Sequence, residues 1–320
     1  MSLSGAEIYR LIETRAQELG FADFGCAHAG ELPNCMQQHY MEALANGHFA
    51  NMEYLGRNLD KRFNPQLLVE GARSVMVFLA PYSLPQGVHP PKGFAQFALG
   101  EDYHIAIKEK LFAIMKELQA HFPEFQGRAF TDSAPVMERY WATSAGLGWI
   151  GKNNFLISRT CGIKNLIGVI ISNLEIPATL DILPDKHLQT TASCGECTRC
   201  MSACPSGALC RPFCTDARKC ISYHTIENRK LQEDIASGAA PHFAGAIFGC
   251  DRCLDVCPWN SANKTGWGVF HKNAEFLSGR NEEWWMGVPE DEFKKRFKDT
   301  SLLRGGLQNI KASIKWGKKE

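Results

Sequence analysis

Residues Cys194 to Pro205 read CGECTRCMSACP, which is the spacing C-x-x-C-x-x-C-x-x-x-C-P. This spacing is typical of bacterial ferredoxins, in which three closely spaced thiolates bind one iron–sulfur cubane and the fourth cysteine ligates the other cluster. A structural zinc site would instead use paired C-x-x-C units and stop at four ligands. The run therefore predicts iron–sulfur chemistry.

A second, incomplete copy of the pattern lies between Gly249 and Pro258, which read GCDRCLDVCP. Its missing first cysteine would fall at Ile247, so one ligand must come from elsewhere, and the candidates are Cys210, Cys214 and Cys220. By the crossing rule of ferredoxins, the first [4Fe-4S] cluster is expected on Cys194, Cys197, Cys200 and Cys257. The second is expected on Cys204, Cys250, Cys253 and the displaced cysteine.

The composition is that of an ordinary globular protein, because 45% of the 320 residues are hydrophobic, 22% are charged and the formal net charge is +1. These values exclude a disordered or collagen-like chain and suggest two domains. No apolar run approaches the roughly 20 residues of a membrane span, and the charged N-terminus is unlike a signal peptide. We expect a soluble, cytoplasmic protein. Dense cysteines in such a protein indicate metal ligands more often than disulfides, and this chain has thirteen.

Strands and helices alternate upstream of the cysteines. A capping box at Ser4 and Glu7 begins an apolar pattern of helical period, and a buried strand is expected at Ser74–Tyr82. A helix at 104–121, strand-like segments at 128–131, 155–158 and 165–172, and a helix at 135–146 complete the pattern. The predicted fold class is α+β, with a mixed α/β domain over 1–188, a ferredoxin-like two-cluster domain over 189–262 and a short, helical, basic tail over 263–320.

The densest polar stretch of the first domain begins at Asp132, at the end of an expected strand. An acid there is well placed to reach a ligand and, if burial raises its pKa, to act as a general acid. The alternative is that Asp132 only caps the next helix, and that Glu138 and Arg139 form a surface ion pair. The glycines at 146, 148 and 151 match G-x-G-x-x-G but follow a helix, so a dinucleotide site is not indicated. They allow either close approach to a large planar ligand or a simple turn.

These motifs together, and in this order, resemble the epoxyqueuosine reductase family over nearly the whole chain. The matching segments are Lys61–Pro65, Gly100–His104, Asp132–Arg139, Ala145–Asn153, Cys194–Pro205, Cys220–Glu227, Gly249–Pro258, and parts of the tail at 292–297 and 300–304. The resemblance implies a cobalamin- and iron–sulfur-dependent enzyme that reduces the epoxide of epoxyqueuosine to queuosine at the wobble position of tRNA.

The resemblance also implies roles for individual residues. Cys220 becomes the displaced ligand of the second cluster, and Asp132 becomes the proton donor. Cobalamin, with its own base detached from cobalt, is expected against Arg62, Asp132, Lys152, Asn153 and Ser222. The family suggests a monomer, and the external electron donor is expected to be of flavodoxin or ferredoxin type.

The C-terminal segment is basic, with nine Lys or Arg residues from Lys294 to Glu320 against Asp299 and Glu320. We expect tRNA phosphate contacts at Lys294, Lys295, Arg296 and Arg304, with Lys298 and Lys311 as further candidates. The alternative is a solvated basic helix.

Three other functions are alternatives to epoxyqueuosine reduction. A cobalamin-dependent reductive dehalogenase would use comparable cofactors, but the lack of an export signal and the Asp132 match argue against it. A ferredoxin-type electron carrier would not need the large α/β domain. A zinc-binding interaction module would not need the ferredoxin spacing. Cys210 and Cys214 have no assigned role.

Overall fold

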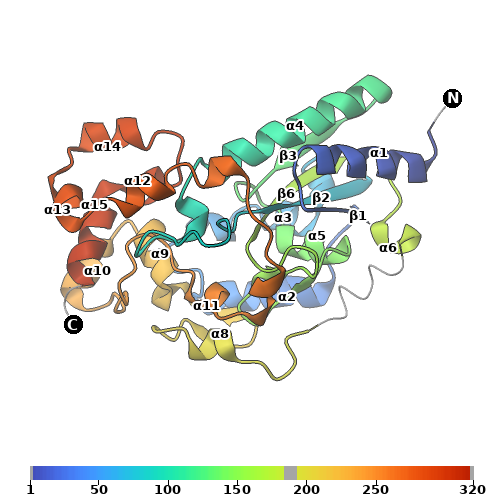
Figure 1. Ribbon diagram of the computed structural model, residues 1–320. Helices are drawn as coiled ribbons and strands as arrows, with labels where there is room; N and C mark the ends of the chain where they lie inside the picture. Colours follow the sequence, from blue (N-terminus) through green and yellow to red (C-terminus); the bar gives the residue numbers. More distant parts are fainter. Residues whose placement is uncertain (1–2, 184–192, 318–320) are drawn as a thin grey trace.

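The computed structural model describes residues 3–183 and 193–317 (Figure 1). Its N-terminal half is built on an antiparallel sheet with strand order β1-β2-β6-β3. The strands are β1 (Asp23–His28), β2 (Ser74–Pro81), β3 (Gly127–Phe130) and β6 (Asn165–Ser172). Every residue of β2 is buried. This central strand is a continuous apolar run because helices cover both faces of the sheet.

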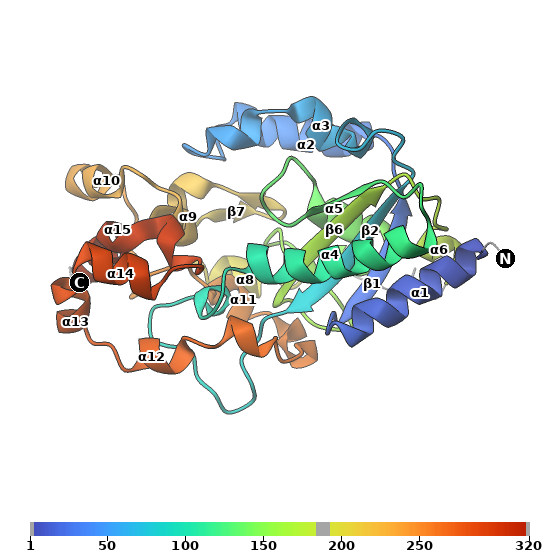
Figure 2. The same cartoon turned by 90° about the horizontal axis from the view of Figure 1, so that it is seen from above.

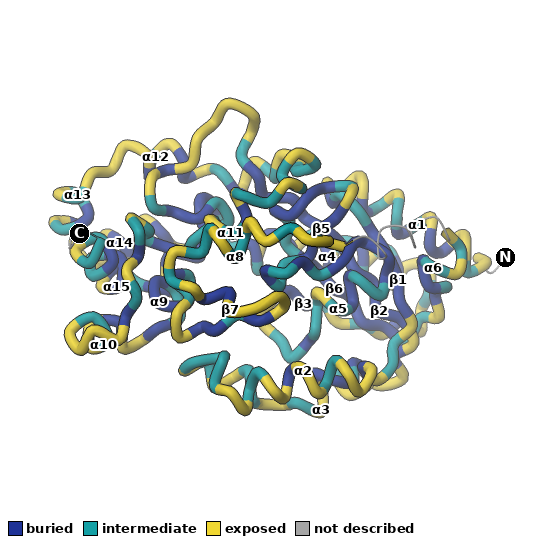
Figure 3. Tube along the Cα trace, turned by 90° about the horizontal axis from the view of Figure 1, so that it is seen from below, coloured by how far each residue is buried: buried dark blue, intermediate teal, exposed yellow. Residues whose placement is uncertain are grey.

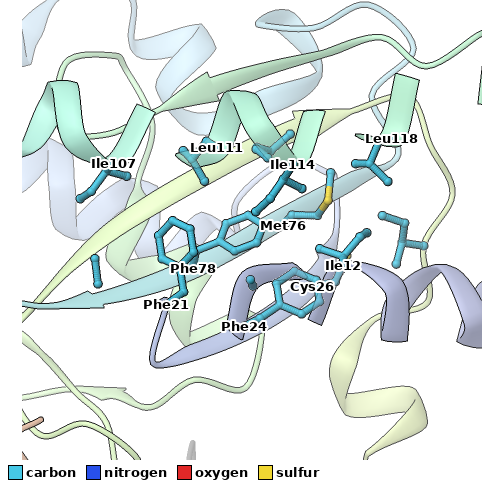
Figure 4. Close-up of a cluster of buried hydrophobic side chains, with 14 of the residues drawn as sticks. Ile12, Phe21, Phe24, Cys26, Met76, Phe78, Ile107, Leu111, Ile114 and Leu118 are labelled. Carbon is cyan, nitrogen blue, oxygen red and sulfur yellow. The ribbon is translucent and has the colours of Figure 1, made fainter. Parts of the chain in front are cut away.

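Alternate residues of β2 supply two separate cores. Met76, Phe78 and Ala80 point to a face covered by α1 (Gly5–Glu18) and α4 (Tyr103–His121), as Figures 2 and 4 show. Val75, Val77 and Leu79 point to the other face. The segments there are α2 (Asn34–Ala45), α3 (Leu59–Phe63) and α5 (Glu138–Ser144). This two-residue alternation follows from the pleat of a strand.

Short elements lie between the strands of this sheet and directly after its last strand. They are η1 (Glu53–Gly56), η2 (Pro65–Leu67), η3 (Gln96–Ala98), β4 (Trp149–Ile150), β5 (Leu156–Ile157) and α6 (Thr179–Ile182). The cysteine region itself contains α8 (Arg199–Ser202), β7 (Leu209–Arg211), β8 (Cys214–Thr215), η5 (Ala217–Lys219), α9 (Ile221–Ile226), α10 (Leu231–Ser237), α11 (Arg252–Asp255) and η6 (Pro258–Ala262). Elements this short bury little apolar surface, which is why the cysteines are expected to stabilise them through metal.

The C-terminal segment is helical, as expected, and it also forms a core. Its elements are η7 (Gly268–Phe270), α12 (Ala274–Ser278), α13 (Glu282–Gly287), α14 (Glu290–Arg296) and α15 (Leu302–Trp316). Trp285, Phe293 and Phe297 are almost fully buried and pack with Phe94 and Phe248 from outside the segment. The segment is therefore an integral helical layer of the protein.

The secondary structure agrees with the sequence prediction in most places. The capping box at Ser4 and Glu7 is present, and β6 has the expected bounds. The helix expected from Pro135 begins only at Glu138, because turns occupy the preceding residues. The expected boundary at 188/189 lies outside the described residues. Among the described residues, the structure contains no helix of the length and apolarity that a membrane span requires.

Candidate active site

The first four predicted cluster cysteines come together around a cavity of about 70 Å³. Its lining includes Cys194, Cys197, Cys200 and Cys257, together with Lys152 and Asn153. Burial raises the pKa of Cys257, and the neighbouring thiols of Cys194, Cys200 and Cys197 raise it further. Two distant sequence runs thus place four thiols side by side, which is the donor set of a [4Fe-4S] cluster.

The second quartet is also assembled. Burial raises the pKa of the Cys253 thiol, and the charges of Cys250, Cys220 and Cys204 act in the same direction. Burial likewise raises the pKa of Cys220, although backbone N–H groups of Tyr223 and Ser222 at the start of α9 oppose the shift. Of the three cysteines left open by spacing alone, Cys220 therefore lies in this group. Cys210 and Cys214 instead contact each other in the β7–β8 hairpin.

The turn at 151–154 connects the sheet domain to both quartets. The Lys152 Nζ donates hydrogen bonds to the carbonyls of Gly195 (2.6 Å) and Cys197 (3.0 Å) in the first cysteine run. The buried Asn153 donates through Nδ2 to the carbonyl of Cys253 at 3.2 Å. Adjacent residues therefore bind the loops of different quartets, and two of the predicted cobalamin contacts, Lys152 and Asn153, lie at this junction.

The glycines before this turn are required by packing. Gly148 has φ +156°, and a Cβ there would lie 2.1 Å from the carbonyl oxygen of Ile157 in β5. A Cβ on Gly151 would lie 2.7 Å from the Ile157 side chain. These contacts favour the simple-turn interpretation, since β5 already occupies the space beside the backbone.

Asp132 does not cap a helix. The N-cap of α5 is Met137, and Asp132 itself adopts the left-handed conformation with φ +52°. Its side chain is 66% exposed, and its Oδ2 accepts a 2.5 Å hydrogen bond from the Tyr103 hydroxyl. Burial and the Asp132 charge raise the pKa of Tyr103, so Tyr103 remains a proton donor to the carboxylate.

His104 approaches the same carboxylate oxygen, with its ring stacked on that of Tyr103 at a centroid distance of 4.1 Å. Its Nε2 is 3.8 Å from Asp132 Oδ2, and its Nδ1 is 2.6 Å from Asp102 Oδ1. Asp102 is the N-cap of α4, and its Oδ1 also accepts the backbone N–H of His104. The segment Gly100–His104 thus positions two proton-carrying side chains against Asp132 through the first turn of a helix.

Glu138 does not form the surface ion pair with Arg139 that sequence left open. Its Oε1 accepts the backbone N–H of Asp132 at 2.6 Å, whereas Arg139 donates to the carbonyl of Asn154 and stacks over Phe155. Loss of solvent around the carboxyl, and then the charge of Asp132, raise the pKa of Glu138 to about 8. A carboxyl that stays protonated near neutral pH therefore lies beside the expected proton donor.

Arg304 reaches this region from the C-terminal layer. Gly305 allows α15 to approach α9, since a Cβ there would lie 2.8 Å from the carbonyl of Thr225. The guanidinium of Arg304 forms a two-pronged contact with Glu227, at 2.9 Å and 2.6 Å. Loss of solvent, and then Glu227 and Asp132, raise the pKa of Tyr54 to about 12, while Arg304 opposes the shift. Tyr54, Glu227 and Arg304 therefore lie near Asp132.

The other predicted tRNA residues lie on α14. Lys294 is 3.5 Å from Glu290 one turn earlier, and Arg296 lies over the ring of Phe276 at 4.0 Å. Lys295 is exposed. The four predicted residues are therefore divided between α14 and the start of α15.

Arg62 is buried at 7% exposure in α3, which is unusual for a guanidinium. It lies over the ring of Tyr40 at 5.4 Å, and its Nε has no hydrogen-bond partner within residues 3–183 and 193–317. A buried polar atom without a partner is costly, so it marks a place where a ligand can complete the bonding. Ser222, at the start of α9, is half-buried.

The sequence assigned no role to Tyr103, His104 or Tyr54. It placed Glu138 in the polar stretch that begins at Asp132, with a surface ion pair to Arg139 as the alternative. Tyr103 and His104 belong to Gly100–His104, one of the segments that carry the family resemblance. No sequence motif marks Tyr54, because only the tertiary fold brings it near Asp132.

Two family models match the chain. The model described as "Epoxyqueuosine reductase QueG, DUF1730" matches residues 62–133, and the "4Fe-4S double cluster binding domain" matches residues 193–260. The second match covers all eight predicted ligand cysteines.

Curated relatives match almost the full length. The epoxyqueuosine reductase of Cyclobacterium marinum is 36% identical over 317 residues, which cover 97% of each chain. That of Synechocystis sp. is 39% identical over 285 residues, which cover 85% of this chain and 94% of the relative.

Solved structures show the same fold. An epoxyqueuosine reductase crystallised with an epoxyqueuosine-modified tRNA-Tyr stem loop superposes with a TM-score of 0.83 at 20% identity, covering 98% of this chain and 81% of the other. The Bacillus subtilis enzyme superposes with a TM-score of 0.81 at 21% identity, covering 98% and 82%.

Proposed function

The chain belongs to the epoxyqueuosine reductase family, and we propose on that premise that it reduces epoxyqueuosine to queuosine at the wobble position of tRNA. The reaction takes up two electrons and two protons and releases one water. The observation that carries the proposal is the convergence of two cysteine quartets and a proton-donor site on neighbouring parts of one fold.

The two quartets fit [4Fe-4S] clusters. Cys194, Cys197, Cys200 and Cys257 are the ligands of the first cluster. Cys204, Cys220, Cys250 and Cys253 are the ligands of the second. Four thiols around a small cavity form the chemically appropriate donor set. Because the loops of both quartets bind Lys152 or Asn153, electrons from either cluster would arrive beside the first domain.

The residues predicted to contact cobalamin also fit that cofactor. The unpartnered Nε of the buried Arg62 can donate to a polar group of the cofactor, and Lys152, Asn153, Asp132 and Ser222 supply further contacts. When bound, cobalamin would supply low-potential cobalt chemistry at the epoxide, with its electrons delivered one at a time by the clusters. The protein's own side chains supply the proton and hold the substrate.

Asp132 supplies the proton. Its Oδ2 is occupied by the Tyr103 hydroxyl, so its acidic proton is carried on Oδ1, which is free to reach the epoxide oxygen. The Asp132 side chain is exposed, so a bound cofactor and substrate can contact it directly. His104 is a positioning residue beside this carboxyl, because Asp102 holds its Nδ1 while its Nε2 faces Asp132 Oδ2 at 3.8 Å.

Arg304, together with Lys294, Lys295 and Arg296, contacts the tRNA backbone. The modified base must leave its stack to reach Asp132, as in other enzymes that act on bases. Arg304 lies near Asp132, and this supports a phosphate contact by Arg304 close to the site of the reaction. A flavodoxin- or ferredoxin-type protein supplies the electrons, and the enzyme acts as a monomer.

The test is reconstitution under anaerobic conditions with iron, sulfide, cobalamin, a strong reductant and tRNA bearing epoxyqueuosine. Nucleosides from the digested tRNA are then weighed. Cobalamin-dependent loss of one oxygen mass is expected. No change in the presence of both clusters and cobalamin would indicate another reducible substrate. Absence of cobalamin binding would favour an electron carrier.

A further inference from the structure

The β7–β8 hairpin contains two cysteines that neither quartet uses. The Sγ atoms of Cys210 and Cys214 are 3.1 Å apart, and the Cys210 thiol also lies 3.6 Å from the carbonyl of Cys214. Cys210 is exposed, and Cys214 is buried at 5% exposure. Figure 3 shows the surface position of β7.

The hairpin that carries these thiols contains a bulge at Cys210. Leu209 pairs with Thr215 and Arg211 pairs with Cys214, which leaves Cys210 as an extra residue on β7. The 3.1 Å contact between the two Sγ atoms shows that Cys210 and Cys214 lie together on this bulged hairpin.

A histidine lies against the buried thiol. The Nδ1 of His48, just after α2, is 3.5 Å from Cys214 Sγ, and the His48 carbonyl accepts the backbone N–H of Ala217 at 2.8 Å. Burial and the adjacent Cys210 raise the pKa of Cys214 to about 11. Cys214 therefore needs a proton acceptor to react as a thiolate, and His48 is within reach of its proton.

We propose that Cys210 and Cys214 form a thiol–disulfide redox site that reacts with small-molecule disulfides such as glutathione disulfide. The exposed Cys210 thiolate attacks one sulfur of that disulfide, whose S–S bond breaks and releases one thiolate. Cys214 then loses its proton to His48 and attacks Cys210 Sγ, which releases the second thiolate. The protein pair is oxidised by two electrons, the small disulfide is reduced, and the two released protons go to the two small thiols.

The site lies next to the residues expected to contact cobalamin. The backbone N–H of Phe213, at the tip of the hairpin, donates to the carbonyl of Lys152 at 3.0 Å. Asn154 donates through Nδ2 to the Thr215 hydroxyl at 2.9 Å. Cys210 and Cys214 lie outside both quartets, so their oxidation is independent of the proposed reduction of epoxyqueuosine.

The test uses the reconstituted holoenzyme under anaerobic conditions. It is incubated with glutathione disulfide, labelled in the native state with N-ethylmaleimide, and mapped by mass spectrometry. We expect a Cys210–Cys214 disulfide that dithiothreitol reverses. Cys214→Ser should stop at a glutathione adduct on Cys210, and Cys210→Ser should leave Cys214 unmodified. Cys35→Ser, at another exposed thiol, should leave the disulfide unchanged.

Iron and sulfide contents are measured in the same samples and should stay constant. The proposal fails if both thiols remain separately labelled, or if the disulfide appears only as the clusters are lost. It also fails if the wild type retains one zinc ion that Cys210→Ser does not, because the pair would then be a metal site. In His48→Gln, the glutathione adduct on Cys210 should persist longer than in the wild type.

Discussion

The backbone N–H of Asp132 donates a 2.6 Å hydrogen bond to Oε1 of Glu138, and Asp132 holds φ +52°. A non-glycine residue in this conformation needs support from its surroundings. One carboxyl group therefore positions the backbone of the other, while Tyr103 holds the Asp132 side chain.

Replacing the Asp132 carboxyl should remove catalysis and leave cofactor binding intact. In Asp132→Asn, we expect turnover to fall by about 10²–10⁴-fold, the usual contribution of a positioned general acid. Single-turnover mass spectrometry measures the rate, and optical titration measures cobalamin binding. Asp181→Asn, at another exposed carboxyl, is the control. Wild-type turnover in Asp132→Asn would exclude the proton-donor role.

Glu138 should make stability depend on pH. Its pKa rises from the ordinary 4.5 to about 8 on folding, so between these values the folded protein binds more protons than the unfolded chain. Stability should therefore fall as pH increases through this window and level off above it. In Glu138→Gln, the thermal midpoint should fall less between pH 5 and pH 8 than in the wild type. The control Glu53→Gln, at an exposed carboxyl, should show the same pH dependence of the thermal midpoint as the wild type. If Glu138→Gln also showed the wild-type pH dependence, the raised pKa of Glu138 would be contradicted.

Arg62 should contribute to cobalamin affinity. A hydrogen bond from a charged group is worth about 1.5–3 kcal/mol, which corresponds to roughly 10–100-fold in the dissociation constant. We expect Arg62→Gln to weaken cobalamin by that factor with unchanged iron content. Arg57→Gln, whose guanidinium forms a surface ion pair with Glu53, is the matched control. Equal affinity in both variants would remove Arg62 from the cofactor site.

Cys220 should be the eighth cluster ligand. In Cys220→Ala, iron and sulfide per chain should fall by about half, because one of two clusters loses a ligand. Cys210→Ala and Cys214→Ala should retain the full content. Elemental analysis and electron paramagnetic resonance of the reduced protein distinguish these cases. A loss of iron in Cys214→Ala with none in Cys220→Ala would reverse the assignment.

The basic residues of α14 should affect tRNA binding through charge. Reversing Lys294 and Lys295 to glutamate should weaken binding and lower the salt dependence of log K by about one for each phosphate that the protein no longer neutralises. Binding titrations at several salt concentrations measure both quantities. Lys116→Glu, at an exposed position of α4, provides the control. Unchanged affinity and slope would leave α14 as a solvated basic helix.

Several elements could be predicted from local sequence. The strand β2 and the helix α4 are long, strongly patterned segments, and their positions agree with the prediction. The start of α5 was predicted three residues early, because the turns at 133–136 have no strong sequence signal. The alternative in which Asp132 caps this helix is wrong, because the same turns separate Asp132 from the N-cap residue Met137.

The cysteine register was determined by sequence alone, because spacing within one loop limits which thiols can reach the same cubane. Spacing left three candidates for the eighth ligand, and only the family resemblance singled out Cys220. The tertiary structure brings Cys220 to Cys253, Tyr103 to Asp132 and Arg304 to Glu227. These partners are separated along the chain by loops, and no local pattern encodes which loops meet. The packing of the sheet, the cysteine region and the C-terminal helices decides which loops meet. Burial of the apolar side chains in the shared cores holds these segments together.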